Sequence, residues 1–245
     1  MNVHLYAHCW NEEAMLPHFF RHYDAVVDAY FIYDTGSTDR SLEILRSHPR
    51  VHLSTPPAGG ASFIEENTAR QNHCWKASRG RADWVVITAI DEHLYHPDLR
   101  RYFDECRRSG VTILRAEGYE MVSDVFPSPD RPEPLCRRIT FGKREPLWFD
   151  KIQAFDPGKI REINYESGRH AASPLGAVVW PEKPELKLLH YKNLGVEYVL
   201  QRYAQLKTGL REGDIAKHLG AHYLWDRNTI VRRFEQIRRA AVQAV

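Results

Sequence analysis

A chain of 245 residues with 43% hydrophobic and 11% aromatic side chains can bury one sizeable core, but not two independent ones. Its 34 basic and 32 acidic residues give a formal net charge of +2, so whole-protein electrostatics give no reason to expect a nucleic-acid partner. No apolar run approaches the roughly 18 residues of a membrane span.

The four cysteines and the N-terminus indicate the compartment. Cys9, Cys74, Cys106 and Cys136 form no CxxC pair, which argues against a disulfide framework and against a zinc ribbon. The first residues lack the basic and apolar segments of a signal peptide. We therefore expect a cytoplasmic protein.

Short β-rich runs alternate with helical periodicity in the first half of the chain. Predicted strands cover residues 3–10, 29–33, 51–54 and 84–90, and predicted helices cover 38–47 and 62–78. A further helix is marked by apolar residues at helical spacing, namely Met15, Leu16, Phe19, Phe20 and Tyr23. This alternation predicts an α/β fold with a mainly parallel, Rossmann-like sheet flanked by helices.

The second half of the chain is less regular. A helix is expected to begin near Pro97 and to end at Gly110, before a strand at 111–114. Residues 123–134 contain four prolines and are predicted to be a binding loop on the acceptor side of a site. Later strands are predicted at 148–155 and 186–191, and later helices at 196–207 and 227–242.

Polar clusters follow three of the predicted strands, at residues 10–12, 34–39 and 91–93. Ligands of open α/β sheets collect at the carboxyl ends of strands. In the middle cluster, Gly36 permits a tight turn, Ser37 or Thr38 can cap the next helix, and Asp34 can accept a hydrogen bond from a nucleobase N–H. Taken alone, the same residues also describe an ordinary capped turn.

Asp91 and Glu92 follow the apolar strand at 84–90. Carboxylates at this position are hard oxygen ligands through which Mg²⁺ or Mn²⁺ can bridge a diphosphate. The alternative is a solvated acidic turn ahead of a helix.

Together these pieces resemble glycosyltransferase family 2, in its compact branch, over about residues 2–94. The pieces that carry the resemblance, in the family's order, are Asn11-Glu12-Glu13, Tyr33-Asp34-Thr35-Gly36-Ser37-Thr38-Asp39, and Ala69-Arg70-Gln71-Asn72 ahead of Trp84-Val85. One departure concerns the family's Asp-x-Asp-Glu-Phe-Leu, which is degenerate here because Ala89 replaces the first acid ahead of Asp91.

The resemblance implies a GT-A fold and transfer of a sugar, with inversion and with Mn²⁺ or Mg²⁺, from a UDP- or GDP-linked donor to a glycan, lipid or other hydroxyl acceptor. It implies that residues 1–194 form the transferase domain, with a nucleotide-binding half at about 1–110, an acceptor half at about 111–194, and a C-terminal helical extension at 195–245 packed on it. The implied nucleotide-binding residues are Trp10, Asn11, Glu12, Asp34, Gly36, Ser37, Arg70 and Asp91.

Among these residues, the resemblance has Trp10 stack on the base, Asp34 hydrogen-bond it, and Asp91 hold the metal. It also suggests His190 as a late metal or diphosphate ligand, the alternative being a buried, hydrogen-bonded histidine. His170 resembles a recurrent family histidine that faces the phosphates or the acceptor, or else lies in a surface loop. His93 replaces the family's aromatic residue in packing, or compensates as a ligand.

Inverting transfer needs a carboxylate that deprotonates the acceptor hydroxyl. Glu120 and Asp124, just before the proline-rich loop, are the candidates, with Asp150 as a further possibility. The missing first acid keeps open a second hypothesis, that of a nucleotide-binding pseudoenzyme. A sugar nucleotidylyltransferase is disfavoured because no glycine-rich phosphate loop follows the first strand.

Other enzyme classes lack their motifs, since the chain has no GxGxxG after the first strand, no GxSxG and no HExxH. The last predicted helix has an apolar stripe formed by Ile230, Phe234, Ile237 and Ala241. Its arginines lie nearer the other face, where they are either solvated or in peripheral contact with anionic lipid at the inner face of the membrane.

Overall fold

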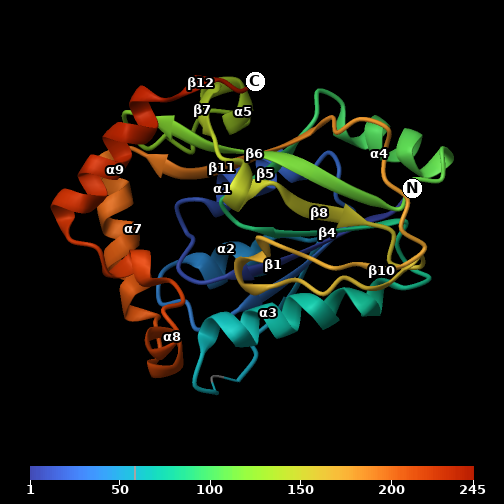
Figure 1. Cartoon of the computed structure of the whole chain (residues 1–245), viewed down its shortest axis with the longest axis horizontal. Helices are drawn as coiled ribbons and strands as arrows, with labels where there is room; N and C mark the ends of the chain where they lie inside the picture. Colours follow the sequence, from blue (N-terminus) through green and yellow to red (C-terminus); the bar gives the residue numbers. More distant parts are fainter. Residues whose placement is uncertain (58) are drawn as a thin grey trace.

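A computed structural model describes residues 1–57 and 59–245 as a mixed α/β fold, in which helices flank a mainly parallel central sheet (Figure 1). The strands follow the order β12-β7-β6-β8-β4-β1-β2-β3, and β11 pairs with both β5 and β6. Strands β3, β2, β1 and β4 are mutually parallel, and β11 is parallel to β6. The predicted α/β class is confirmed.

Each predicted unit of the first half is present, with small shifts at its ends. The strands of this half are β1 (Val3–Cys9), β2 (Ala29–Asp34), β3 (Val51–Ser54), β4 (Trp84–Ala89) and β5 (Glu92–Tyr95). The helices are α1 (Leu16–Tyr23), α2 (Ser41–Ser47), α3 (Phe63–His73), the 3-10 helix η1 (Cys74–Ser78) and α4 (Leu99–Arg108).

The second half departs further from the prediction. Its strands are β6 (Ile113–Ser123), β7 (Phe141–Arg144), β8 (Lys151–Phe155), β9 (Ile160–Glu162), β10 (Leu175–Gly176), β11 (Leu186–Leu194) and β12 (Val242–Gln243). Its helices are α5 (Leu135–Arg138), α6 (Pro146–Phe149), η2 (Ser167–Arg169), α7 (Val196–Thr208), α8 (Glu212–Ala216), η3 (Ala221–Leu224) and α9 (Arg227–Arg239).

Two predicted strands were wrong in extent. The strand expected at 111–114 is only the start of β6, which continues to Ser123. Along this length β6 pairs with β8, β7 and β11. The strand expected at 148–155 begins as the helical turn α6, because Pro146 at the first helical position favours a helix start. Residues 124–134 contain no helix or strand, as predicted for the proline-rich loop.

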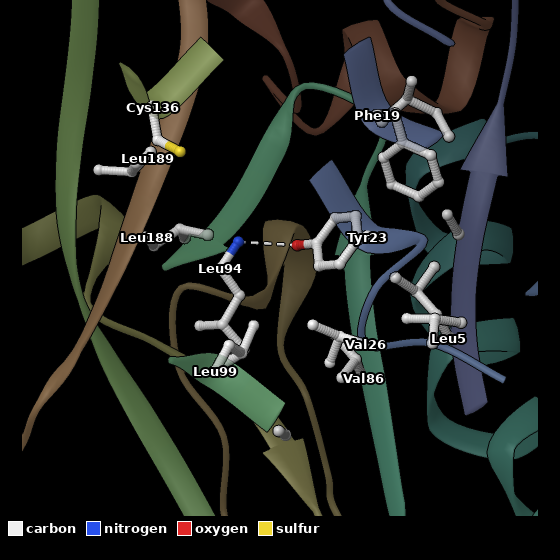
Figure 2. Close-up of a cluster of buried hydrophobic side chains, with 14 of the residues drawn as sticks. Leu5, Phe19, Tyr23, Val26, Val86, Leu94, Leu99, Cys136, Leu188 and Leu189 are labelled. Carbon is white, nitrogen blue, oxygen red and sulfur yellow. Dashed lines mark hydrogen bonds between the residues drawn. The ribbon is translucent and has the colours of Figure 1, made fainter. Parts of the chain in front are cut away.

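Side chains that alternate along the central strands pack into two clusters, one on each face of the sheet. On β1, Val3 and Leu5 join the large cluster against α1, whereas Tyr6 joins a second cluster that contains Trp75 of η1. In the large cluster, the Tyr23 hydroxyl accepts a hydrogen bond from the Leu94 amide at 2.7 Å and ties α1 to β5 (Figure 2). The sheet is therefore covered on both faces, as a mainly parallel sheet requires.

The register of the central strands brings their carboxyl ends to the same level. Cys9 of β1 lies opposite Asp34 of β2, and His8 lies opposite Ala89 of β4. The loops that follow these three strands therefore leave the same edge of the sheet side by side.

The C-terminal helices pack beside this sheet (Figure 1). Ile230, Phe234 and Ile237 of α9 are buried with Val122 of β6 and Val199 of α7. The helix predicted to reach residue 242 ends at Arg239, because Val242–Gln243 instead adds β12 to the edge strand β7. In the described part of the chain, no helix is both long and apolar enough to cross a bilayer.

The burial of Ile230, Phe234 and Ile237 limits the predicted contact of α9 with lipid. The apolar stripe of α9 is part of the protein interior and is not available to enter a membrane. Any contact with anionic lipid would depend on exposed arginines such as Arg232 and Arg239 alone.

Helix α8 fixes the beginning of α3, although the two are far apart in sequence. The carboxylate of the fully buried Asp214 accepts hydrogen bonds from the Ser62 hydroxyl at 2.6 Å and from the amides of Phe63 and Ile64 at 3.1 Å. These amides are among the donors that a helix start leaves without a partner. Asp214 therefore caps α3 from another helix.

We expect Asp214→Ala to lower the free energy of unfolding by about 2 kcal/mol, because several buried donors lose their acceptor. Burial opposes ionisation of Asp214, but hydrogen bonds from Ser62 and from backbone amides lower its pKa. A group with a lowered pKa stabilises the fold above its ordinary value and loses this effect as the pH falls. The difference between wild type and variant, measured by urea unfolding, should therefore shrink below about pH 4.

Glu212→Ala is the matched control, because Glu212 is exposed on the same helix. Its effect should stay within about 0.5 kcal/mol. Equal effects of the two substitutions would contradict the capping role.

Candidate functional site

The turn after β2 is organised by the carboxylate of Asp34, which is 1% exposed. Its Oδ1 accepts hydrogen bonds from the Gly36 and Ser37 amides at 3.0 Å, and its Oδ2 accepts one from the Ser37 hydroxyl at 2.5 Å. Gly36 has φ +93°, a conformation that favours glycine. The tight turn predicted around Gly36 is present, and Asp34 uses much of its acceptor capacity to hold it.

The turn after β1 is bonded directly to this one. The Asn11 side-chain oxygen accepts a hydrogen bond from the Thr38 amide at 2.6 Å, and the Asn11 amide donates to the Ser37 hydroxyl at 2.8 Å. Asn11 has φ +53°, which asparagine tolerates better than most residues. The two turns therefore form one cross-linked unit.

The predicted capping of α2 by Ser37 or Thr38 was wrong. The helix begins later, at Ser41, because the Ser37 hydroxyl is bonded to Asp34 and Asn11. At the start of this helix, the Asp39 carboxylate accepts a hydrogen bond from the Ser41 amide at 2.9 Å.

Arg202 of α7 holds the turn after β1 from the outside. Its guanidinium donates to the carbonyl oxygens of Trp10 at 3.1 Å and Asn11 at 2.9 Å, and it forms an ion pair with Glu12. The Trp10 ring packs against Gly209 at the end of α7, where an added methyl group would lie 2.8 Å from the ring. Glu12 and Trp10 therefore anchor α7 to the sheet edge.

A pocket of about 260 Å³ opens beside the Asp34 turn. Its walls come from the ends of β2 and β3, from α3 and from the segment before α8; they include Asp34, Gly36, Pro56, Phe63, Arg70 and Arg211. Arg211 also pairs with Glu66 of α3 at 2.7 Å. Trp10 does not line this pocket, so its stacking on a base stays a prediction.

Arg70 has a buried side-chain nitrogen without a hydrogen-bond partner in the described part of the chain. Its Cζ lies 5.6 Å from the centre of the Tyr33 ring, and its Nη1 is buried without a hydrogen-bond partner in the described part of the chain. A buried donor without an acceptor is costly. Arg70 is therefore positioned to receive an acceptor atom from a ligand.

Asp91 and His190 meet at the end of β4. The His190 Nε2–H donates to Asp91 Oδ2 at 3.1 Å, and the Tyr191 amide donates to the Asp91 carbonyl oxygen at 2.8 Å. The Asp91 side chain is 23% exposed, so it is reachable from solvent. Burial opposes its ionisation, but the neighbouring His190 lowers the pKa of Asp91 below the ordinary value.

Glu92 points the other way, and its predicted role in a pair of exposed metal-binding carboxylates is wrong. It starts β5, is 2% exposed, and forms ion pairs with Lys151 of β8 at 2.7 Å and with Arg169 of η2. Its Oε2 also accepts the Ala89 amide at 3.0 Å. Burial by itself would raise its pKa, but the charges of Arg169 and Lys151 hold the pKa of Glu92 well below the ordinary value.

The two other histidines singled out in the sequence differ in exposure. His93 is fully buried, stacked on His22 with ring centres 4.6 Å apart, so it is the predicted packing residue and not a ligand. His170 is exposed, and its Nδ1–H donates to the Trp148 carbonyl oxygen at 2.6 Å. Phe149 contacts both His170 and His190, which places His170 at the rim of the Asp91 region.

The candidate bases lie in different surroundings. Glu120 of β6 is 6% exposed, accepts a hydrogen bond from Arg233 at 3.0 Å, and lies opposite His190 in the parallel ladder. Paired positions on neighbouring strands point to the same face, about 5 Å apart. Asp124 lies beyond β6, 3.8 Å from Arg238, with its side chain 84% exposed. Asp150 forms a bidentate pair with Arg144 and is structural.

The donor set at Asp91 can be compared with the needs of a cation. One carboxylate and one imidazole form a pair that Mn²⁺ accepts. No group of three or more His, Cys, Asp or Glu residues suited to a metal occurs within residues 1–57 and 59–245. The pair therefore fits Mg²⁺ or Mn²⁺ only if substrate phosphate oxygens and water complete the coordination, which is how Mg²⁺ is commonly held.

Sequence reasoning missed the cations of the site. Lys151, Arg169, Arg202 and Arg211 come from the second half of the chain, where no motif marks them. A half-buried arginine on a helix has the same sequence signature as a solvated one. Only Arg169, which precedes His170, and Lys192, which follows the His190 segment, had a neighbouring signal.

No protein-family model matches the chain, and no curated protein matches its sequence. Among solved structures, the chain resembles S. aureus TarS, with a TM-score of 0.45 and 11% identity over 96% of this chain. It spans 43% of the length of that TarS chain.

Two further likenesses are weaker. The first is to a 4-diphosphocytidyl-2C-methyl-D-erythritol synthase, with a TM-score of 0.36 and 14% identity over 64% of this chain and 75% of that one. The second is to glucosyl-3-phosphoglycerate synthase from Mycobacterium tuberculosis, with a TM-score of 0.33 and 20% identity over 48% of this chain and 44% of that one.

We expect Glu92→Gln to destabilise the protein by about 3–5 kcal/mol in urea unfolding, because it leaves Lys151 and Arg169 buried without a carboxylate. Glu105→Gln is the control, since it breaks an exposed pair with Arg101. That change should cost less than about 0.5 kcal/mol. Similar losses in both variants would mean that the buried pairs contribute no more than surface ones.

Proposed function

We propose that this protein is a glycosyltransferase that uses a nucleoside-diphosphate sugar, linked to UDP or GDP, and transfers the sugar to a hydroxyl acceptor. One observation carries the proposal. A pocket beside Asp34 and the partly exposed Asp91, hydrogen-bonded to the buried His190, lie at the same edge of the sheet, because β1, β2 and β4 are parallel and in register. A nucleoside in the pocket would direct its phosphates towards Asp91.

The pocket has the chemistry of a nucleobase site. Phe63 and Pro56 offer apolar surfaces for a planar ring, and Arg70 offers a free donor to a base carbonyl oxygen. Asp34 and Glu66 offer acceptors to a base N–H. Uracil and guanine both carry an N–H donor that these carboxylates can accept, so the choice between UDP and GDP is left to measurement.

Asp91 and His190 would hold Mg²⁺ or Mn²⁺ together with the donor diphosphate. A cation there would neutralise the charge that develops on the leaving group. The protein's own part is to fix these two ligands. His190 is held by β11 between β5 and β6, and the Asp91 carbonyl is bonded to the Tyr191 amide.

Glu120 is the proposed base. In the transfer, the acceptor oxygen forms a bond to the anomeric carbon as the bond from that carbon to the phosphate oxygen breaks. The electron pair leaves with the diphosphate, and the hydroxyl proton passes to Glu120. Its Oε2 is bonded to Arg233, which leaves Oε1 to accept the proton. Asp124 is more exposed and is the less suitable of the two predicted bases.

A thermal-shift panel of UDP, GDP, CDP and TDP with Mn²⁺ tests the proposed donor class. We expect one nucleotide, UDP or GDP, to raise the melting temperature most, since a ligand that binds only the folded state stabilises it by mass action. Asp91→Ala should remove the metal-dependent part of this shift, and Ala89→Asp should keep or increase it.

The outcomes separate the hypotheses. A response to none of the four nucleotides would overturn the proposal. Binding without any release of nucleotide from a nucleotide sugar would favour the nucleotide-binding pseudoenzyme. An unchanged Mn²⁺ effect in Asp91→Ala would contradict the metal assignment.

Glu120→Gln tests the base. We expect the rate of nucleotide release from the stabilising nucleotide sugar to fall by about 100- to 10,000-fold, the usual contribution of a general base, with unchanged nucleotide affinity. Asp124→Asn serves as the control, and its rate of nucleotide release should fall far less. A larger loss in Asp124→Asn than in Glu120→Gln would reverse the assignment.

A further inference from the structure

Lys192 of β11 lies between aromatic rings close to the proposed phosphate site. Its Nζ is 4.8 Å from the centre of the Tyr203 ring and 4.9 Å from that of Tyr223. It is also 3.4 Å from Nε2 of His222. Aromatic faces attract a cation but do not neutralise its charge.

The ammonium of Lys192 has no ion-pair partner in the described part of the chain, unlike the other cations nearby. Lys151 and Arg169 are paired with Glu92, and Arg202 is paired with Glu12. Burial lowers the pKa of His222 to about 3, and the Lys192 charge acts in the same direction, so the imidazole is neutral. Its Nε2 can accept a hydrogen bond from Lys192 but supplies no negative charge.

The position of Lys192 ties it to the Asp91–His190 pair. Lys192 directly follows Tyr191 on β11, and the Tyr191 amide is hydrogen-bonded to the Asp91 carbonyl oxygen at 2.8 Å. Burial raises the pKa of Tyr223 to about 12, and the nearby charge of Asp91 adds to this effect. The rings around Lys192 thus border the region where a donor diphosphate would lie.

We propose that Lys192 is a binding residue for the donor diphosphate and supplies positive charge that compensates for the missing first acid at Ala89. This inference rests on the proposed function. With Asp91 as the one accessible carboxylate of the motif, a cation is held weakly, and a fixed ammonium stabilises the leaving phosphate oxygens directly. In this role Lys192 acts by charge and hydrogen bonding and transfers no proton.

The test compares ligands that differ only in their phosphates. Affinities of the nucleoside, its monophosphate and its diphosphate are measured by calorimetry in EDTA, with the base that stabilises the protein best. We expect Lys192→Met to weaken diphosphate binding by about 10- to 100-fold, as for loss of a hydrogen bond to a charged group, and to leave nucleoside affinity unchanged. Lys192→Arg should retain most of the diphosphate affinity.

Methionine keeps an apolar chain against the two tyrosines, so the fold should survive, which the melting temperature without ligand will show. Lys207→Met, an exposed change on α7, is the matched control and should bind like wild type. An equal loss of nucleoside and diphosphate affinity in Lys192→Met would overturn the inference in favour of a packing role. An unchanged diphosphate affinity would also overturn it and leave the proposed function standing, whereas a wild type that binds no nucleotide, either in EDTA or with Mn²⁺, would overturn both.

Discussion

The buried carboxylate of Glu92 is the constraint on which the site depends. A charge without solvent must be compensated, and its two cations come from β8 and η2, more than fifty residues further along the chain. Loss of any of the three charges would leave the others buried and unpaired. The triad therefore fixes the chain next to Asp91, whose own carboxylate remains accessible because its neighbour is turned into the core.

The loops at the sheet edge are rigid for a related reason. The side chains of Asp34 and Ser37 and the backbone of Asn11 are hydrogen-bonded to one another. Arg202 donates hydrogen bonds to the carbonyl oxygens of Trp10 and Asn11 in the turn after β1. Internal hydrogen bonds of this kind hold a site in one geometry before a ligand arrives. Free capacity is left where a ligand would meet it, above all at the Nη1 of Arg70.

The second half of the chain contributes charge to a site built on the strands of the first half. Arg211 lines the pocket, Arg202 braces the turn, and Lys192 lies between tyrosines beside the Asp91 region. The first two are paired with carboxylates and the third is not. Positive charge without a counterion, next to a single accessible carboxylate, is the electrostatic character expected of a place that receives phosphates.

The sequence by itself determined the α/β class, the first four β–α units and the clusters at Asp34 and Asp91, because local periodicity and turn chemistry encode them. It could not determine that Glu92 faces inward, that β5 and β7 exist, or that His190 contacts Asp91. The hydrogen bond between His190 and Asp91 joins residues 99 positions apart, and no local pattern records such a contact. The tertiary structure alone decided which polar residues are used up inside the fold and which remain free to bind.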